Sequence, residues 1–98
     1  MAFPRLSETE AVILELLVNR GELYGLQMIA HEPSLKRGTI YVTLGRMADK
    51  GFVESREVKE PSTPGLPRRL FKATGLGQRA LAASRAAAAV MSGELGYA

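Results

Sequence analysis

The residues whose types and spacing suggest chemistry are cations and hydroxyls in the segment 35–51, LKRGTIYVTLGRMADKG. On a helix of about 3.6 residues per turn, apolar residues collect on one side of this segment and polar residues on the other. The polar side is formed by Lys36, Thr39, Thr43, Arg46 and Lys50. It contains three cations and no acid, whereas a solvated helix face usually mixes charges of both signs. The pattern therefore predicts contact with a polyanion.

The distribution of charge along the chain supports the same interpretation. The 98 residues have a formal net charge of +3, but residues 1–34 have a balance of −3 and residues 35–85 a balance of +7. Basic residues that are segregated into one part of a chain are typical of nucleic-acid-binding proteins. We therefore expect the polyanion to be a nucleic acid.

Composition argues against several other classes of function. The chain has no cysteine and a single histidine, His31, so we expect neither a disulfide nor a metal site. No nucleophile–base arrangement and no complete glycine-rich phosphate loop is present, which predicts no catalytic residue, no cofactor and no enzyme activity. We see no signal peptide and no apolar run of about 20 residues, so we expect a cytoplasmic protein without membrane contact.

The polar face needs a scaffold, and the residues before it predict two helices. Ser7 and Glu10 form a capping box at the start of an apolar-rich helix that continues to Arg20, where Gly21 can end it. A short second helix is expected over residues 24–30.

The third helix is expected over residues 35–51. Pro33 disfavours a helical conformation in the residue before it and so separates the second helix from the third. Ser34 is the expected N-cap of the third helix, because a serine hydroxyl can accept a hydrogen bond from a free amide of the first turn.

The pattern then changes to strands. Residues 52–58 and 69–73 contain β-branched and aromatic residues, and the proline-rich stretch 59–67 joins them as a long hairpin loop. Thr74 is the expected N-cap of a final helix that ends near Met91. The sequence thus predicts a mainly α fold with a small β-hairpin wing, a winged helix-turn-helix of order α-α-α-β-β-α.

This order divides the chain into a DNA-binding domain at residues 1–74 and a dimerisation helix with a tail at residues 75–98. In helix-turn-helix proteins the later helix enters the major groove. The expected DNA contacts are Lys36, Arg37, Thr39, Tyr41, Thr43, Arg46, Lys50, Lys59, Arg68 and Arg69. Tyr41 can equally be a packing residue and Lys50 can equally be solvated, while Val42 could touch a thymine methyl group.

Size and the alanine-rich final helix predict a homodimer. A chain of 98 residues without disulfides or metal sites has a small core and gains stability from burial against a second copy. The expected dimer contacts are Leu76, Ala80, Ala83, Ala87 and Val90. The alternative is that the alanines only favour an exposed helix.

Four stretches of the sequence carry a resemblance to a known family. They are LSETEAVILELL, ELYGLQMIA, GTIYVTLGRMADKGFVES and PRRLFKATGLGQRALA, within residues 6–82. Together they resemble the PadR-like transcriptional regulators. The resemblance implies a homodimeric DNA-binding regulator, commonly a repressor, with a dimer contact between C-terminal and N-terminal helices and, in several members, a small-molecule effector. Val42 stands where the family often has proline, and the single C-terminal helix resembles the short branch of the family.

We therefore expect a regulator that binds double-stranded DNA at an inverted-repeat operator, with two recognition helices about one helical turn apart. The alternatives are a winged-helix module that binds proteins and a ligand-sensing dimer without strong DNA binding. Affinity for DNA that falls steeply with salt separates the first function from the other two, because phosphate contacts release counterions.

Overall fold

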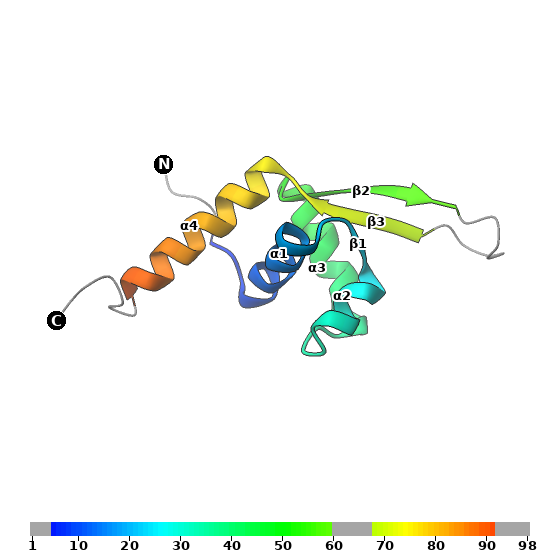
Figure 1. Ribbon diagram of the computed structural model, residues 1–98, viewed down its shortest axis with the longest axis horizontal. Coiled ribbons are helices and arrows are strands. Elements are labelled where there is room, and N and C mark those ends of the chain that lie inside the picture. The colour runs from blue at the N-terminus through cyan, green and yellow to red at the C-terminus, as the bar shows by residue number, and fades with distance from the viewer. Residues whose placement is uncertain (1–4, 60–67, 92–98) are drawn as a thin grey trace.

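The computed structural model describes residues 5–59 and 68–91. In this part of the chain the elements are α1 (Glu8–Arg20), β1 (Leu23–Tyr24), α2 (Gly25–His31), α3 (Arg37–Asp49), β2 (Val53–Val58), β3 (Arg68–Ala73) and α4 (Gly75–Met91). The three strands form an antiparallel sheet in the order β1-β3-β2. The β2–β3 hairpin extends from one end of the molecule and α4 from the other (Figure 1). The predicted winged helix-turn-helix is confirmed, with one strand more than expected.

The additional strand corrects the predicted start of the second helix. Leu23 and Tyr24 pair with Phe71 and Leu70 on the free edge of β3, so Tyr24 precedes α2 as its N-cap and the helix begins at Gly25. Two residues are too few for a strand to be recognised by alternation. Only the position of β3 makes them a strand.

The caps of α1 are those that the sequence predicts. The amide of Glu10 donates to the hydroxyl of Ser7 at 3.2 Å, and the amide of Ser7 donates to Oε1 of Glu10 at 2.9 Å. Gly21 follows the helix with a φ of 82°, a conformation that favours glycine.

The start of α3 differs from the prediction. The helix begins at Arg37 with Lys36 as its N-cap, and no side chain caps it. The hydroxyl of Ser34 donates instead to a carboxylate oxygen of Glu32 at 2.9 Å. Ser34 is therefore not the N-cap, because the turn after α2 continues for two residues more than the sequence suggested.

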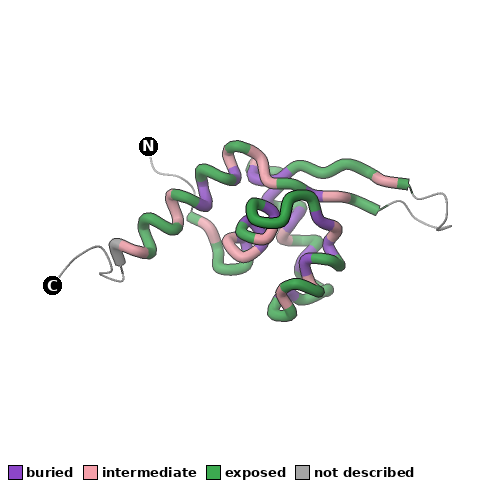
Figure 2. The backbone as a smooth tube through the Cα atoms, viewed as in Figure 1, coloured by how far each residue is buried: buried purple, intermediate pink, exposed green. Residues whose placement is uncertain are grey.

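The core lies where the helices meet the sheet (Figure 2). Its buried members are Ile13, Leu14, Leu17, Leu23, Met28, Leu35, Ile40, Leu44, Met47, Phe52, Val53, Phe71, Ala80 and Leu81. Each large aliphatic side chain that is fully buried contributes about 1.5–3 kcal/mol. Since α3 supplies three such residues, its rotation about its own axis is strongly determined by the core.

The first half of α4 belongs to this core, which corrects part of the predicted dimer contact. Ala80 is only 1% exposed within its own chain and has no surface left for a partner. Leu76 is partly buried and packs against the same core. Ala83 is half-buried, Ala87 is exposed, and the side chain of Val90 lies outside the described part. A helical projection of α4 does not distinguish residues that face the core of the same chain from residues that face outward.

Candidate nucleic-acid interface

Helix α3 turns its polar side to solvent. Lys36, Thr39 and Arg46 are exposed and Thr43 is half-buried. On the opposite side, the exposed fractions of Ile40, Leu44 and Met47 are 1%, 1% and 0%, respectively. The predicted division of this helix into an apolar and a polar face is confirmed.

Three cations at the start of this helix and on its polar side have no acidic partner among the described residues. Lys50, Arg56, Arg69, Lys72 and Arg85 each face a carboxylate within 4 Å. The other described cations form no ion pair: Lys36, Arg37 and Arg46 here, and Arg5, Arg20, Lys59, Arg68 and Arg79 elsewhere. A cation without an acidic partner keeps its full attraction for phosphate. The segment of α3 from Arg37 to Arg46 and the residue before it therefore form the candidate interface.

Lys50 has a different role from the two that the sequence left open. Its Nζ lies 2.8 Å from Oε2 of Glu10, whose side chain is 7% exposed. Burial raises the pKa of Glu10, but hydrogen bonds from Lys50 and Ser7 and the charge of Lys50 outweigh it, so the pKa is lowered. Lys50 thus ties the end of α3 to the start of α1. A helical projection of 35–51 could not show an acid that comes from another helix.

The ion pair makes a prediction about stability and pH. Because the pKa of Glu10 is lowered in the folded state, its stabilising contribution is complete above the ordinary pKa of a glutamate and is lost as the pH falls through the folded-state value. We expect Glu10→Gln to lower the free energy of unfolding at neutral pH by about 1–2 kcal/mol and to flatten its dependence on pH in the acid range. Thermal unfolding followed by circular dichroism from neutral pH to about pH 3 measures both effects.

Glutamine is the informative replacement because it can still accept the hydrogen bond of the capping box. Glu8→Gln is the matched control, since Glu8 lies in the same first turn, is exposed and has no ion pair in the described structure. Equal melting of Glu10→Gln and the wild type at neutral pH would show that the ion pair contributes nothing.

Two hydroxyls on the polar face already donate to the backbone. Oγ1 of Thr39 donates to the carbonyl of Lys36 at 3.3 Å, and Oγ1 of Thr43 donates to the carbonyl of Thr39 at 3.1 Å. A phosphate oxygen needs a donor, so these threonines offer a partner mainly their oxygen lone pairs and methyl groups. The cations are therefore the primary candidates for phosphate contact.

Tyr41 both packs and remains accessible. Its side chain lies close against Gly25. A Cβ added to Gly25 would lie 2.8 Å from the hydroxyl oxygen and from a ring carbon of Tyr41. The residue is nevertheless 50% exposed. Tyr41 therefore sets the approach of α2 to α3. Sequence reasoning noted Gly25 only as part of a motif and missed this contact.

The predicted wing cations are not equivalent. Arg69 faces Glu57 across the hairpin at 3.5 Å, while the guanidinium of Arg68 lies 5.6 Å from the centre of the Tyr24 ring. Lys59 is exposed and has no ion pair in the described part. Exposed pairs such as Arg69–Glu57 are worth about 0–1 kcal/mol. Lys59 and Arg68 thus retain their charge for a partner, and residues 60–67 of the predicted wing lie outside the described part.

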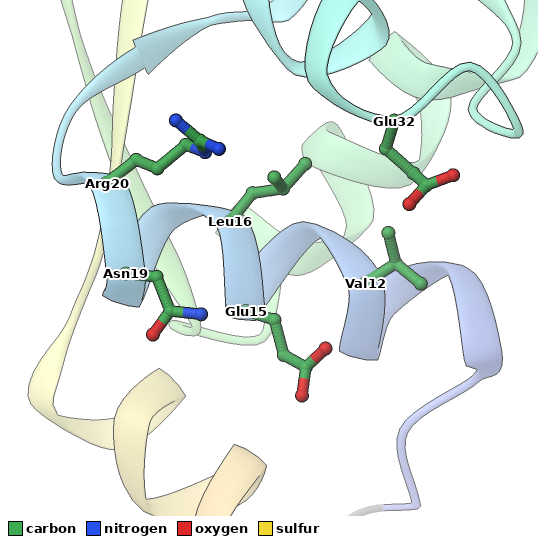
Figure 3. Close-up of a pocket in the computed structure, with 6 residues that line it drawn as sticks. All are labelled: Val12, Glu15, Leu16, Asn19, Arg20 and Glu32. Atoms are coloured by element: carbon green, nitrogen blue, oxygen red, sulfur yellow. The ribbon is translucent and has the colours of Figure 1, made fainter.

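A shallow hollow follows the surface of α1 (Figure 3). It has a volume of about 420 Å³ and is lined by Val12, Glu15, Leu16, Asn19, Arg20 and Glu32. In the close-up Glu15 points toward α4, where it accepts a hydrogen bond from Arg85 at 2.8 Å. The hollow therefore lies on the exposed surface of α1, between Glu32 of the turn after α2 and the side from which Glu15 reaches α4.

Other kinds of site find no support in the described residues. They contain no group of three or more acidic or histidine side chains that could hold a metal ion. None of the helices described is both long enough and apolar enough to cross a membrane.

Comparisons with known proteins agree with the fold. The model of the transcriptional regulator PadR-like family matches residues 13–83. A PadR-like transcription factor from Bacteroides fragilis is 23% identical with a TM-score of 0.78, covering 89% of this chain and 85% of its own. A PadR family regulator from Clostridium difficile R20291 is 26% identical with a TM-score of 0.71, covering 92% of this chain and 100% of its own.

One similar structure contains DNA. Bacillus subtilis PadR, in complex with operator DNA, is 24% identical with a TM-score of 0.68, and the match covers 76% of this chain and 45% of that one. At this level of identity the likeness shows the fold. No curated protein matches the chain.

Proposed function

The chain belongs to the PadR-like family of transcriptional regulators, and from this premise we propose that it binds operator DNA through α3 and the β2–β3 wing. Membership of a family of regulators also agrees with the expectation that it is not an enzyme. The observation that carries the proposal is the set of exposed cations without an ion pair at the start of α3, Lys36 and Arg37, and on its polar side, Arg46. Uncompensated cations on a helix of this fold are suited to a strand of phosphates.

The start of α3 offers further contacts to the DNA backbone. No side chain caps this helix, so amides of its first turn remain free to donate to a phosphate oxygen. Lys36 and Arg37 lie beside these amides. Arg46, two and a half turns further on, is placed either to bind a guanine with two hydrogen bonds or to hold a phosphate.

We propose that the regulator binds an inverted repeat as a homodimer. Ala83 and Ala87 lie on the part of α4 that leads away from the core, and Ala87 is exposed. Alanines allow helices to approach closely, and a shallow hollow lies on the exposed surface of α1. The dimer contact would join this part of α4 to α1 of the second chain. The family resemblance supports a role as a repressor, while the cytoplasmic location and a small-molecule effector stay predictions.

Selection of bound DNA from a random pool, with the mass of the complex measured in parallel, tests the proposal. We expect an inverted repeat with half-sites about one helical turn apart, two chains per site, and affinity that falls with salt by a log–log slope of about −0.9 for each phosphate contact. One chain per site would contradict the dimer alone. Failure to enrich any DNA would favour a protein-binding module, and salt-independent affinity would exclude the α3 face as the interface.

A further inference from the structure

The side of α3 that faces away from the core carries an exposed apolar residue. Val42 is 56% exposed, the highest value among the large hydrophobic residues described. At about 100° per residue it lies almost opposite the direction of the buried Ile40, Leu44 and Met47. The cations of the predicted polar face, Lys36, Arg46 and Lys50, lie to one side of Val42. Val42 therefore lies on the surface of α3 that is available to a partner.

On one side of Val42 the neighbouring positions of the helix carry no side chain. Gly38 and Gly45, four residues before and three after it, are exposed, and an added Cβ at either would meet nothing within 4 Å. Thr39 and Arg46 flank it on the other side of the helix. The isopropyl group of Val42 thus protrudes between two positions that have no side chain.

The surrounding charge indicates what this apolar tip contacts. A protein partner that covered Val42 would also have to take Arg46, four residues further on, out of water without an acid of this chain to compensate it. A DNA groove presents phosphates to this cation and to Lys36 at the start of the helix. Asp49 is exposed near the end of the helix and would be repelled by phosphates, so the contact is confined to the residues before it.

We propose that Val42 determines part of the operator sequence by packing against the C5 methyl group of a thymine. The inference rests on the proposed DNA-binding function. The thymine methyl is the apolar group that base edges offer in the major groove, whereas phosphates and the other base edges offer hydrogen-bond partners that valine cannot use. The absence of side chains at Gly38 and Gly45 permits the close approach that a methyl contact requires.

Removing the methyl group from the DNA tests the assignment. Once an operator has been selected with the wild-type chain, each thymine is replaced singly by deoxyuridine and the affinity is measured for the wild type and for Val42→Ala. We expect one thymine in each half-site at which deoxyuridine weakens wild-type binding about threefold or more. Binding by Val42→Ala should be weaker on the unmodified operator and insensitive to deoxyuridine at that position.

Val18→Ala is the matched control, because Val18 is also an exposed valine, 39% exposed, but lies on α1. This variant should show the same deoxyuridine profile as the wild type. Equal sensitivity of the wild type and Val42→Ala at every thymine would overturn the assignment, and so would an operator without any sensitive thymine. Both results leave DNA binding intact. Failure of the selection itself would overturn the proposed function and the role of Val42 with it.

Discussion

The double variant Lys36→Ala, Arg46→Ala is expected to lose operator binding while it keeps its fold. Both side chains are exposed and neither has an ion pair in the described structure, so their removal takes nothing from the core. In a dimer four positive charges leave the interface. If each contributes about 1 kcal/mol or more, the affinity for the operator falls at least a hundredfold. Fluorescence anisotropy with the selected operator measures the loss, and thermal unfolding checks the fold.

The control for net charge is the double variant Arg5→Ala, Arg79→Ala. These arginines are also exposed and form no ion pair among the described residues, but Arg5 precedes α1 and Arg79 lies on α4. This variant should retain most of the operator affinity. If both double variants lose affinity equally, the attraction is a property of total charge and α3 is not the recognition helix.

The single variants separate the two roles open to Arg46. If Arg46 contacts a phosphate, Arg46→Ala lowers the magnitude of the salt slope by about 1 per contact and leaves the selected sequence unchanged. If it binds a guanine, the variant tolerates other bases at one position of each half-site. Repeating the DNA selection with the variant distinguishes these outcomes.

Gly77→Ala is expected to be strongly destabilising. An added Cβ would lie 2.1 Å from the carbonyl oxygen of Phe52 and 3.1 Å from Cδ2 of Leu14. The first of these is backbone and cannot rotate away. The same carbonyl accepts from the amide of Thr74 at 3.0 Å, and the amide of Gly77 donates to the hydroxyl of Thr74 at 3.0 Å. The substitution must therefore separate the start of α4 from Phe52, in the connection between α3 and β2.

We expect a loss of about 3 kcal/mol or more, a large part of the roughly 5–15 kcal/mol that stabilises a small domain. Denaturant unfolding measures it. Gly45→Ala is the matched control, because an added Cβ there meets nothing within 4 Å and alanine favours a helix interior by about 1 kcal/mol. The same substitution thus has opposite signs at the two positions. A wild-type midpoint for Gly77→Ala would show that the close approach of α4 is wrong.

Much of the fold was predictable because its signals are local. The capping box of Ser7 and Glu10 and the spacing of Ile40, Leu44 and Met47 appear in the structure as the sequence predicted. Signals that depend on distant residues were missed. Leu23 and Tyr24 form a strand because they pair with the edge of β3. Ala80 is buried because the first half of α4 packs against the core of the same chain.

The sequence by itself determined which side of α3 faces the core and that the opposite side is basic, because helical periodicity follows from local backbone geometry. Only the tertiary structure decided which cations remain without an acidic partner. Glu10 of α1 forms an ion pair with Lys50, and Glu57 forms one with Arg69 across the hairpin. Ion pairing and exposure depend on distances between elements that are far apart in the chain, and no helical projection contains those distances.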